Sequence, residues 1–407
     1  MIVRLAPTTP QTTEQKDDMT KTSLTGSWSY PTTVRVGAGR ISELAEVCRA
    51  LDMSRPLLVT DQGLAALPMV TDALAANDAV GLPTGMFSDV RPNPLGSNVH
   101  AGVQVFTTGN HDGIIAFGGG SAMDVGKLIA FMAGQTRSLW DFEDIGDYWR
   151  RADADAIAPI VAVPTTSGTG SEVGRAGVAT HEATHTKKVI FHPRMMPGVV
   201  ICDPTLVAGL PPHLTAWTGM DALVHCLEAY CATGYHPIAN GVALEGLKLI
   251  RHWLPRAVSD GADLEARTHM MSAAAMGATA FQKGLGAIHS LSHPVGAIYD
   301  THHGLTNAVF TPYVLMFNQS AIQDRMFDLA CYLGLPKPSF QAVVDWTLAL
   351  REQFKIPHTA ATFNIETDRL EDLAAMAAAD PTASSNPGPA DAAAMLRMYE
   401  VALMGVL

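Results

Sequence analysis

Short apolar runs alternate with helix-like segments through the first half of the chain. Four runs rich in β-branched and aliphatic residues have the length of a strand, at 56–60, 113–117, 159–163 and 198–201. Segments with helical spacing, such as 122–133, separate them. Strands that alternate with helices are typical of a mainly parallel sheet with both faces covered. The pattern predicts an α/β domain over residues 22–203.

The pattern changes after Asp203-Pro204. Apolar positions then recur with helical spacing in stretches rich in Ala, Leu and Met, at 222–233, 239–257, 267–281 and 340–354. Clear strand patterns become scarce. We therefore expect residues 204–407 to form an all-α domain, with a proline- and serine-containing loop at 380–391 before the last helix.

Composition narrows the class of protein. The chain has 407 residues, of which 47% are hydrophobic and 16% charged, as in a globular protein of two domains. A net charge of −12 argues against a nucleic-acid or anionic-membrane surface. No uninterrupted apolar run reaches the roughly 18 residues of a membrane span. Residues 1–21 are polar and predict a flexible tail, not a signal peptide. Five scattered cysteines without a CxxC motif favour the reducing cytosol.

Two loops that follow predicted strands are suited to phosphate. The first, GGGS at 118–121, leads into a helix, and the second is PTTSGTGSE at 164–172. Glycines let the backbone approach a phosphate, and a helix N-terminus offers free N–H groups. The spacing fits neither GxGxxG nor a Walker loop, and either segment alone could be a tight turn or a polar loop. Two such loops at strand ends favour a bound dinucleotide.

Asp61 directly follows the strand at 56–60. A carboxylate at that edge can accept a hydrogen bond from a ribose 2′-OH and would repel a 2′-phosphate, which favours NAD over NADP. Asp61 can equally be the N-cap of a helix that starts at Gln62.

Histidines and one aspartate in the second half suggest a metal site. Asp221 and His225 lie one helical turn apart, His289 and His293 repeat that spacing, and His303 follows in a turn. Any one of these histidines alone could be an ordinary core or surface residue. A carboxylate with three imidazoles can close around one divalent metal and leave room for an exchangeable ligand.

A further histidine motif, HEATH at 181–185, matches the HExxH signature of zinc proteases. That mechanism needs a helix that holds both histidines on one face. The stretch instead is rich in threonine, follows a strand-like run and continues into Val189-Ile190-Phe191. It therefore predicts a hairpin or loop, and we reject a protease site.

These segments together resemble the iron-containing alcohol dehydrogenase family, from about Ser27 to the C-terminus. The resemblance rests on GGGSAMDVGK at 118–127, PTTSGTGSE at 164–172, GMDALVHCLEAY at 219–230 and HSLSHPVGAIYDTHHG at 289–304. It implies a nucleotide in the cleft between two domains and a metal on the helical side. The implied metal ligands are Asp221, His225, His289 and His303. The implied cofactor-binding residues, beside Asp61, are Asn93, Gly118, Gly119, Gly120, Ser121, Asp124, Thr165, Thr166, Thr169, Ser171 and Lys187.

Some of these roles come with alternatives. Asn93 would lie near the cofactor, or is a turn residue between two prolines. Lys187 would meet the nicotinamide ribose, and His293 would relay a proton near the metal. His302 is a neighbouring candidate ligand, but the distance from His289 along the chain and the following glycine favour His303. Lys283 would attract a carboxylate-bearing substrate, or is a solvated surface lysine.

The expected reaction is hydride transfer between a small primary or secondary alcohol, or a hydroxyacid, and nicotinamide. A metal would act as Lewis acid, and His293 or water would carry the proton. The resemblance implies iron(II), although the ligand set also suits zinc.

The alternative functions are a hydroxyacid–oxoacid transhydrogenase, a maleylacetate-type reductase on the same fold, and a non-catalytic metal- or nucleotide-binding protein. The complete ligand set argues against the metal-free reductase. We expect a homo-oligomer. Trp140, Phe142 and Trp149 are either pocket walls or core aromatics.

Overall fold

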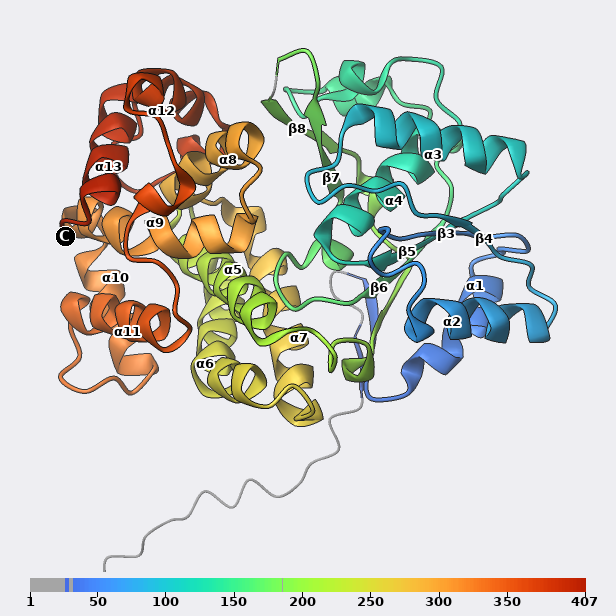
Figure 1. Cartoon of the computed structure of the whole chain (residues 1–407), viewed down its shortest axis with the longest axis horizontal. Helices are drawn as coiled ribbons and strands as arrows, with labels where there is room; N and C mark the ends of the chain where they lie inside the picture. Colours follow the sequence, from blue (N-terminus) through green and yellow to red (C-terminus); the bar gives the residue numbers. More distant parts are fainter. Residues whose placement is uncertain (1–25, 29–31, 185) are drawn as a thin grey trace, which may run out of the picture.

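The structure, a computed structural model, describes residues 26–28, 32–184 and 186–407. The predicted flexible tail, 1–21, lies outside the described residues, as does His185. The N-terminal half is built on a seven-stranded sheet (Figure 1). All neighbouring strands run parallel except β1, which is antiparallel to β2. The order across the sheet is β1 (Gly26–Trp28), β2 (Thr33–Val36), β9 (Val199–Cys202), β6 (Ile160–Pro164), β5 (Ile114–Gly118), β3 (Leu57–Val59) and β4 (Gly85–Phe87).

Helices cover both faces of this sheet, which is why β5 and β6 are apolar at nearly every position and wholly buried. Ile115 and Phe117 of β5 face the side where α1 (Leu44–Ala50) and α2 (Pro68–Ala79) pack. Ile114 and Ala116 face the opposite side, where α3 (Gly96–Thr108) and α4 (Gly120–Met132) pack. The predicted α/β class of this half is confirmed.

The HEATH stretch lies in a two-stranded antiparallel hairpin, as predicted. β7 (Ala176–His181) ends at the first histidine of the motif, and β8 (Thr186–Phe191) begins just after it. The His181 imidazole lies 2.8 Å from the Thr184 hydroxyl and packs edge-on against Trp140. No helix therefore holds residues 181–184, the part of this motif that the structure describes.

Helices make up the C-terminal half, and the structure has no strand between 204 and 407. α5 lies at its centre and is buried from Thr215 onward on nearly every side, which explains its apolar residues all round. None of the described helices is long and apolar enough to cross a membrane. In order the helices are α5 (Pro212–Cys231), α6 (Pro237–Ser259), α7 (Leu264–Ala280), α8 (Ala287–Tyr299), α9 (His303–Phe317), α10 (Gln319–Tyr332), α11 (Phe340–Gln353), α12 (Leu370–Ala379) and α13 (Ala392–Met404).

Each half has its own main core, and the two halves are packed together through α7. Met271, Ala275 and Ala278 of α7 belong to the same buried cluster as one face of the sheet. The change from strands to helices falls between Cys202 and Pro212. We propose a domain boundary within that connection, near residue 203.

Candidate metal centre and nucleotide loops

Four side chains from three helices converge in the helical half. α5 supplies Asp221 and His225, α8 supplies His289, and His303 is the first residue of α9. One ligand atom from each lies within 4.8 Å of all the others. Asp221, His225 and His289 are buried, while His303 is partly exposed. The structure thus brings together the four residues that the sequence selects as metal ligands.

The geometry of the acceptor atoms fits a cation. Asp221 Oδ1 lies 2.8 Å from the amide nitrogen of Asn307, His289 Nε2 lies 3.3 Å from it, and His303 Nε2 lies 3.1 Å from it. Three lone-pair atoms therefore converge on one place. Metal bonds of about 2.1 Å keep ligand atoms within about 4.2 Å of one another, so small side-chain movements suffice to close this set around a metal.

Burial shifts the imidazoles towards the form that binds metals. It lowers the pKa of His225 to about 4 and holds the pKa of His303 well below its ordinary value, with nearby Lys187 acting in the same direction. Both rings are therefore neutral at pH 7, as metal coordination requires. Burial also opposes protonation of His289, but the hydrogen bond and charge of Glu228 outweigh it and raise the pKa of His289.

His293 lies beside this cluster, on the side of an open cleft. Its ring centroid is 5.5 Å from that of His303, and its Nδ1 lies 2.8 Å from Asp380 Oδ2. The cleft has a volume of about 380 Å³ and lies between β8 and the α8–α12 region, with Lys187, His293 and Asp380 among its lining residues.

The structure separates the two adjacent histidines at the start of α9. His302 is the N-cap of the helix, where its Nδ1 accepts from the Leu305 N–H at 3.4 Å. Its ring packs against Trp217 with centroids 5.0 Å apart. His303, and not His302, belongs to the ligand cluster, in agreement with the choice made from spacing.

The two predicted phosphate loops contact each other at the carboxyl ends of β5 and β6. A side chain on Gly119 would place its Cβ 3.3 Å from Thr166, and one on Gly120 would place it 2.6 Å from Thr169. Glycine is thus required where the threonine loop passes over the start of α4. Gly118 has φ 149°, and the buried Thr165 donates its backbone N–H to the Gly118 carbonyl at 2.9 Å. Backbone N–H groups at the start of α4 are suited to an anion.

Ser171 of the threonine loop is hydrogen-bonded to Asp124 of α4. Ser171 Oγ donates to Asp124 Oδ1 at 2.5 Å, and the other oxygen of Asp124 accepts from the Val178 N–H at 3.1 Å. Buried Lys127 donates to Ser171 Oγ at 2.6 Å. Ser121 Oγ donates to the Pro92 carbonyl. These polar groups fasten α4, the threonine loop and the hairpin together, and direct contact of Ser121, Asp124 or Ser171 with a cofactor stays a prediction.

The remaining cofactor candidates are Asp61, Asn93 and Lys187. Asp61 Oδ1 accepts from the N–H groups of Gly63 and Leu64 at 2.8 and 3.1 Å and so holds a turn. No helix starts at Gln62, because α2 begins only at Pro68, so the N-cap alternative was wrong. Asn93 donates to Asp300 Oδ1 at 2.5 Å and so links the two halves of the chain. Lys187 lies on β8, where desolvation lowers its pKa against the pull of surrounding carboxylates.

The aromatic residues considered as pocket walls pack elsewhere. Phe142 is fully buried in the core, and Trp149 packs edge-on against Phe191 and His192. Neither these two nor Trp140 lines the cleft. Lys283 is partly buried and donates to the Tyr230 carbonyl and to Asn240, and burial lowers its pKa to about 8. It is therefore not a freely solvated surface lysine, which was one of the two roles considered for it.

Sequence reasoning missed three polar residues of the site. They are Glu228, which contacts His289, Asn307, which contacts Asp221, and Asp380, which contacts His293. A residue that accepts from or donates to a ligand has no fixed spacing from it, so nothing in the pattern singles these residues out.

A parallel sheet with glycine loops at its carboxyl edge, together with a histidine cluster in the helical half, fits an oxidoreductase that exchanges hydride with a nucleotide. Two family models match this chain: iron-containing alcohol dehydrogenase over residues 31–204, and the C-terminal part of the Fe-containing alcohol dehydrogenase family over 215–403. The chain belongs to this family. It is an enzyme, an NAD-dependent alcohol dehydrogenase, and the family implies a divalent metal.

Curated relatives and solved structures agree with this assignment. The chain is 39% identical over 385 residues to 4-hydroxybutyrate dehydrogenase of Cupriavidus necator, covering 91% of this chain and 98% of the relative. It is 36% identical to 1,3-propanediol dehydrogenase of Citrobacter freundii, covering 86% and 92%. A crystal structure of 1,3-propanediol oxidoreductase superposes with a TM-score of 0.85 at 34% identity, covering 90% and 97%. Sulfoacetaldehyde reductase from Bifidobacterium kashiwanohense, solved in complex with NAD+, gives a TM-score of 0.83 at 28% identity, covering 91% and 97%.

Proposed function

We propose that this dehydrogenase acts on small primary alcohols that carry a second polar group, and on the matching aldehydes. The observation that carries the proposal is the convergence of Asp221, His225, His289 and His303 beside a cleft of about 380 Å³. That cleft is lined by charged side chains as well as apolar ones, which suits a short substrate with a polar far end. Relatives named for 4-hydroxybutyrate and 1,3-propanediol support the same substrate class.

The four convergent side chains would hold one divalent metal, which when bound supplies a Lewis acid for the alcohol oxygen. His293 lies where it can receive the proton of the alcohol, directly or through water, and pass it to the cleft. Its contact with Asp380 holds the ring in one orientation. The neutral state of His225 and His303 leaves their lone pairs free for the metal.

The nucleotide would lie across the carboxyl edge of the sheet. We propose that its pyrophosphate contacts the backbone of Gly118, Gly119 and Gly120 at the start of α4, with Thr165, Thr166 and Thr169 on the other side. Asp61 would face the adenosine ribose with the oxygen that does not cap the turn, which favours NAD over NADP. Asn93 and Lys187 would lie nearer the nicotinamide end.

A substrate panel with anaerobically purified, metal-analysed protein tests this proposal. We expect NAD-linked oxidation of 4-hydroxybutyrate or 1,3-propanediol at least tenfold faster, in kcat/KM, than oxidation of ethanol. Equal or better activity with NADP would contradict the reading of Asp61. Turnover of a hydroxyacid with an oxoacid and no added nucleotide would instead support the transhydrogenase. Stoichiometric metal without NAD-linked activity on any alcohol or aldehyde would support a non-catalytic protein.

Three coarser properties complete the proposal. We propose iron(II) as the resident metal, with zinc as the alternative that metal analysis decides. We propose the cytosol, since the cysteines are all free and four of the five are buried.

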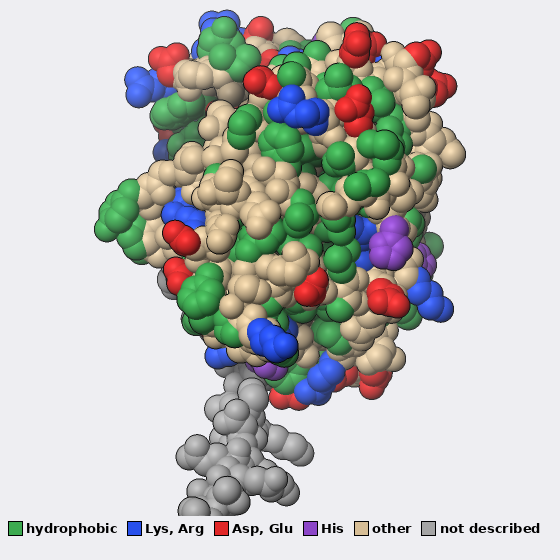
Figure 2. All heavy atoms as spheres, turned by 90° about the vertical axis from the view of Figure 1, so that its left-hand side faces the viewer, with side chains coloured by type: hydrophobic (Ala, Val, Ile, Leu, Met, Phe, Trp, Pro, Cys, Tyr) green, Lys and Arg blue, Asp and Glu red, His purple; other side chains and the backbone are tan. Residues whose placement is uncertain are grey.

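We propose a homo-oligomer formed through the helical half. Figure 2 shows hydrophobic side chains spread over the face on which α10–α13 lie, and Phe327 and Tyr332 of α10 are exposed. Sizing in solution tests the last point.

A further inference from the structure

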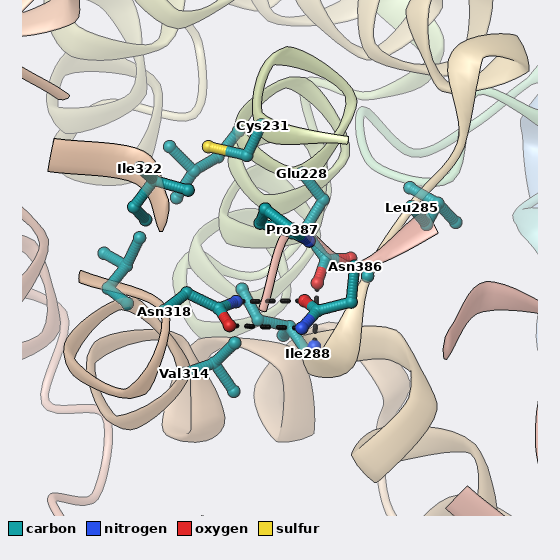
Figure 3. Close-up of a pocket in the computed structure, with 12 residues that line it drawn as sticks. Glu228, Cys231, Leu285, Ile288, Val314, Asn318, Ile322, Asn386 and Pro387 are labelled. Carbon is teal, nitrogen blue, oxygen red and sulfur yellow. Dashed lines mark hydrogen bonds between the residues drawn. The ribbon is translucent and has the colours of Figure 1, made fainter. Parts of the chain in front are cut away.

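Glu228 of α5 uses its two carboxylate oxygens on two different partners from the start of α8. Oε1 accepts from the Ile288 N–H at 2.7 Å, and Oε2 lies 2.6 Å from His289 Nδ1. The side chain is buried, and the close-up in Figure 3 shows it pointing towards the first turn of α8. Both oxygens of the Glu228 carboxylate are therefore held in place. Glu228 itself lies about one helical turn after His225 on α5.

This contact determines which nitrogen of His289 carries a proton. An ionised carboxylate can only accept hydrogen bonds, so Nδ1 of His289 must be the donor. In the neutral ring the lone pair then belongs to Nε2, and Nε2 is the atom that faces the cluster, 3.3 Å from the Asn307 amide nitrogen. The two contacts of His289 therefore favour the tautomer that a metal needs.

The surroundings hold Glu228 in this position. Next to it, Asn318 and Asn386 exchange amide hydrogen bonds of 2.9 and 3.1 Å, and Asn386 Oδ1 also accepts from the Ala287 N–H at 3.1 Å (Figure 3). Gly286 allows the close approach, since a Cβ there would lie 2.9 Å from Glu228 Oε1. The start of α8 is thus fitted to the carboxylate.

The burial of two carboxylates at this place also favours a bound cation. Asp221 and Glu228 are both buried, with relative exposures of 2% and 6%. Burying two carboxylates is costly unless positive charge compensates them. A divalent cation held by the cluster would supply positive charge close to both carboxylates.

We propose that Glu228 is a positioning residue that sets the metal affinity of the site by fixing the tautomer and orientation of His289. This inference rests on the proposed metal role of the four-residue cluster. Partners of this kind behind a metal-binding histidine typically change metal affinity 10- to 100-fold when altered.

Glu228→Gln provides the direct test. If the glutamine oxygen keeps the Ile288 N–H, its NH₂ group faces His289 Nδ1 and favours the tautomer with the proton on Nε2. We expect the dissociation constant for Zn²⁺, measured by chelator competition on metal-free protein, to rise about 10- to 100-fold. The unfolding midpoint of the metal-free variant should stay close to that of the wild type. Cys231→Ala is the matched control, because Cys231 lies three residues after Glu228 on α5 and lines, with Glu228, a small cavity beside the start of α8 (Figure 3).

A second variant keeps the test decisive if the first does not fold. Gly286→Ala would displace the carboxylate without changing its charge, and it should weaken Zn²⁺ binding in the same direction. Zn²⁺ affinity within threefold of the wild type in a folded Glu228→Gln or Gly286→Ala protein overturns the inference. If the wild type itself binds no divalent metal, the proposed function fails instead, so the two failures are distinguishable.

Discussion

His293 Nδ1 and Asp380 Oδ2 lie 2.8 Å apart, and this contact joins the helix of the metal cluster to the segment that follows α12. The other oxygen of Asp380 accepts from the backbone N–H and the hydroxyl of Thr382, at 2.9 and 2.6 Å. Burial raises the pKa of Asp380, but His293 and Thr382 outweigh this effect and lower it. The carboxylate is therefore charged and fixed, and it orients a ring that lies beside the cluster, 5.5 Å from that of His303.

Asp380→Asn should lower kcat about tenfold or more, because the amide can present its NH₂ group to His293 and turn the ring away from its working orientation. KM for NAD should not change, since Asp380 lies away from the glycine loops. Asp391→Asn is the matched control, because Asp391 caps α13 in the same part of the chain and does not line the cleft. If Asp380→Asn kept the kcat of the wild type, catalysis would not depend on the orientation of His293 by Asp380.

The adjacent histidines at 302 and 303 should respond differently to alanine. His303→Ala should lose stoichiometric metal and alcohol oxidation, because it removes one of the four converging ligands. His302→Ala should keep both and lose only about 1 kcal/mol of unfolding free energy, the typical effect of a lost helix cap. Metal content and urea denaturation of both variants check this pair. Loss of metal in His302→Ala alone would reverse the ligand assignment.

Buried Glu172 of the threonine loop should make the stability of the protein depend on pH, independently of the metal site. It is 3% exposed, and burial raises the pKa of its carboxyl to about 7, against the opposing effects of its own backbone N–H and of Lys127. The unfolded chain loses this proton near its ordinary pKa of 4.5, while the folded chain keeps it until about pH 7. Between these values the folded state binds more protons, so the Glu172 contribution to stability is present below about pH 4.5 and is lost as the pH rises.

Glu172→Gln should therefore stabilise the protein more at pH 8 than at pH 5, by about 1–3 kcal/mol. Urea unfolding of the variant and the wild type at both pH values measures the difference. Glu265→Gln, at an exposed position on α7, serves as the control. It should change the free energy of unfolding by the same amount at pH 5 and at pH 8. A pH-independent effect of Glu172→Gln would mean that Glu172 is ionised in the folded protein at both values.

Much of the fold can be predicted because its signals are local. The strands β3, β5, β6 and β9 are uninterrupted apolar runs, buried on both faces, and they lie within a residue or two of the predicted ranges. β2 and β4 were not predicted, since each is only partly buried and lacks the uninterrupted apolar run of the other strands. The predicted loop at 380–391 begins with the short 3-10 helix Pro381–Ser385, directly after the carboxylate that holds His293.

The candidate metal ligands can be predicted from the sequence, but the residues that form hydrogen bonds around them cannot. Few residue types bind a divalent metal, so residue chemistry and the i, i+4 pairs point to a metal site, and the family resemblance implies the set Asp221, His225, His289 and His303. Glu228, Asn307 and Asp380 act through single hydrogen bonds whose geometry exists only in the folded chain. The same applies to Asp124 and Ser171, whose mutual contact could not be read from the motifs that contain them.

The metal-to-protein ratio of anaerobically purified wild type and Asp221→Ala tests the central claim most directly. Asp221 is buried, and its Oδ1 lies 3.6 Å from His303 and 4.0 Å from His225. The account predicts about one divalent metal per chain in the wild type and almost none in the variant. A wild type without metal, or a variant that keeps its full content, would contradict it.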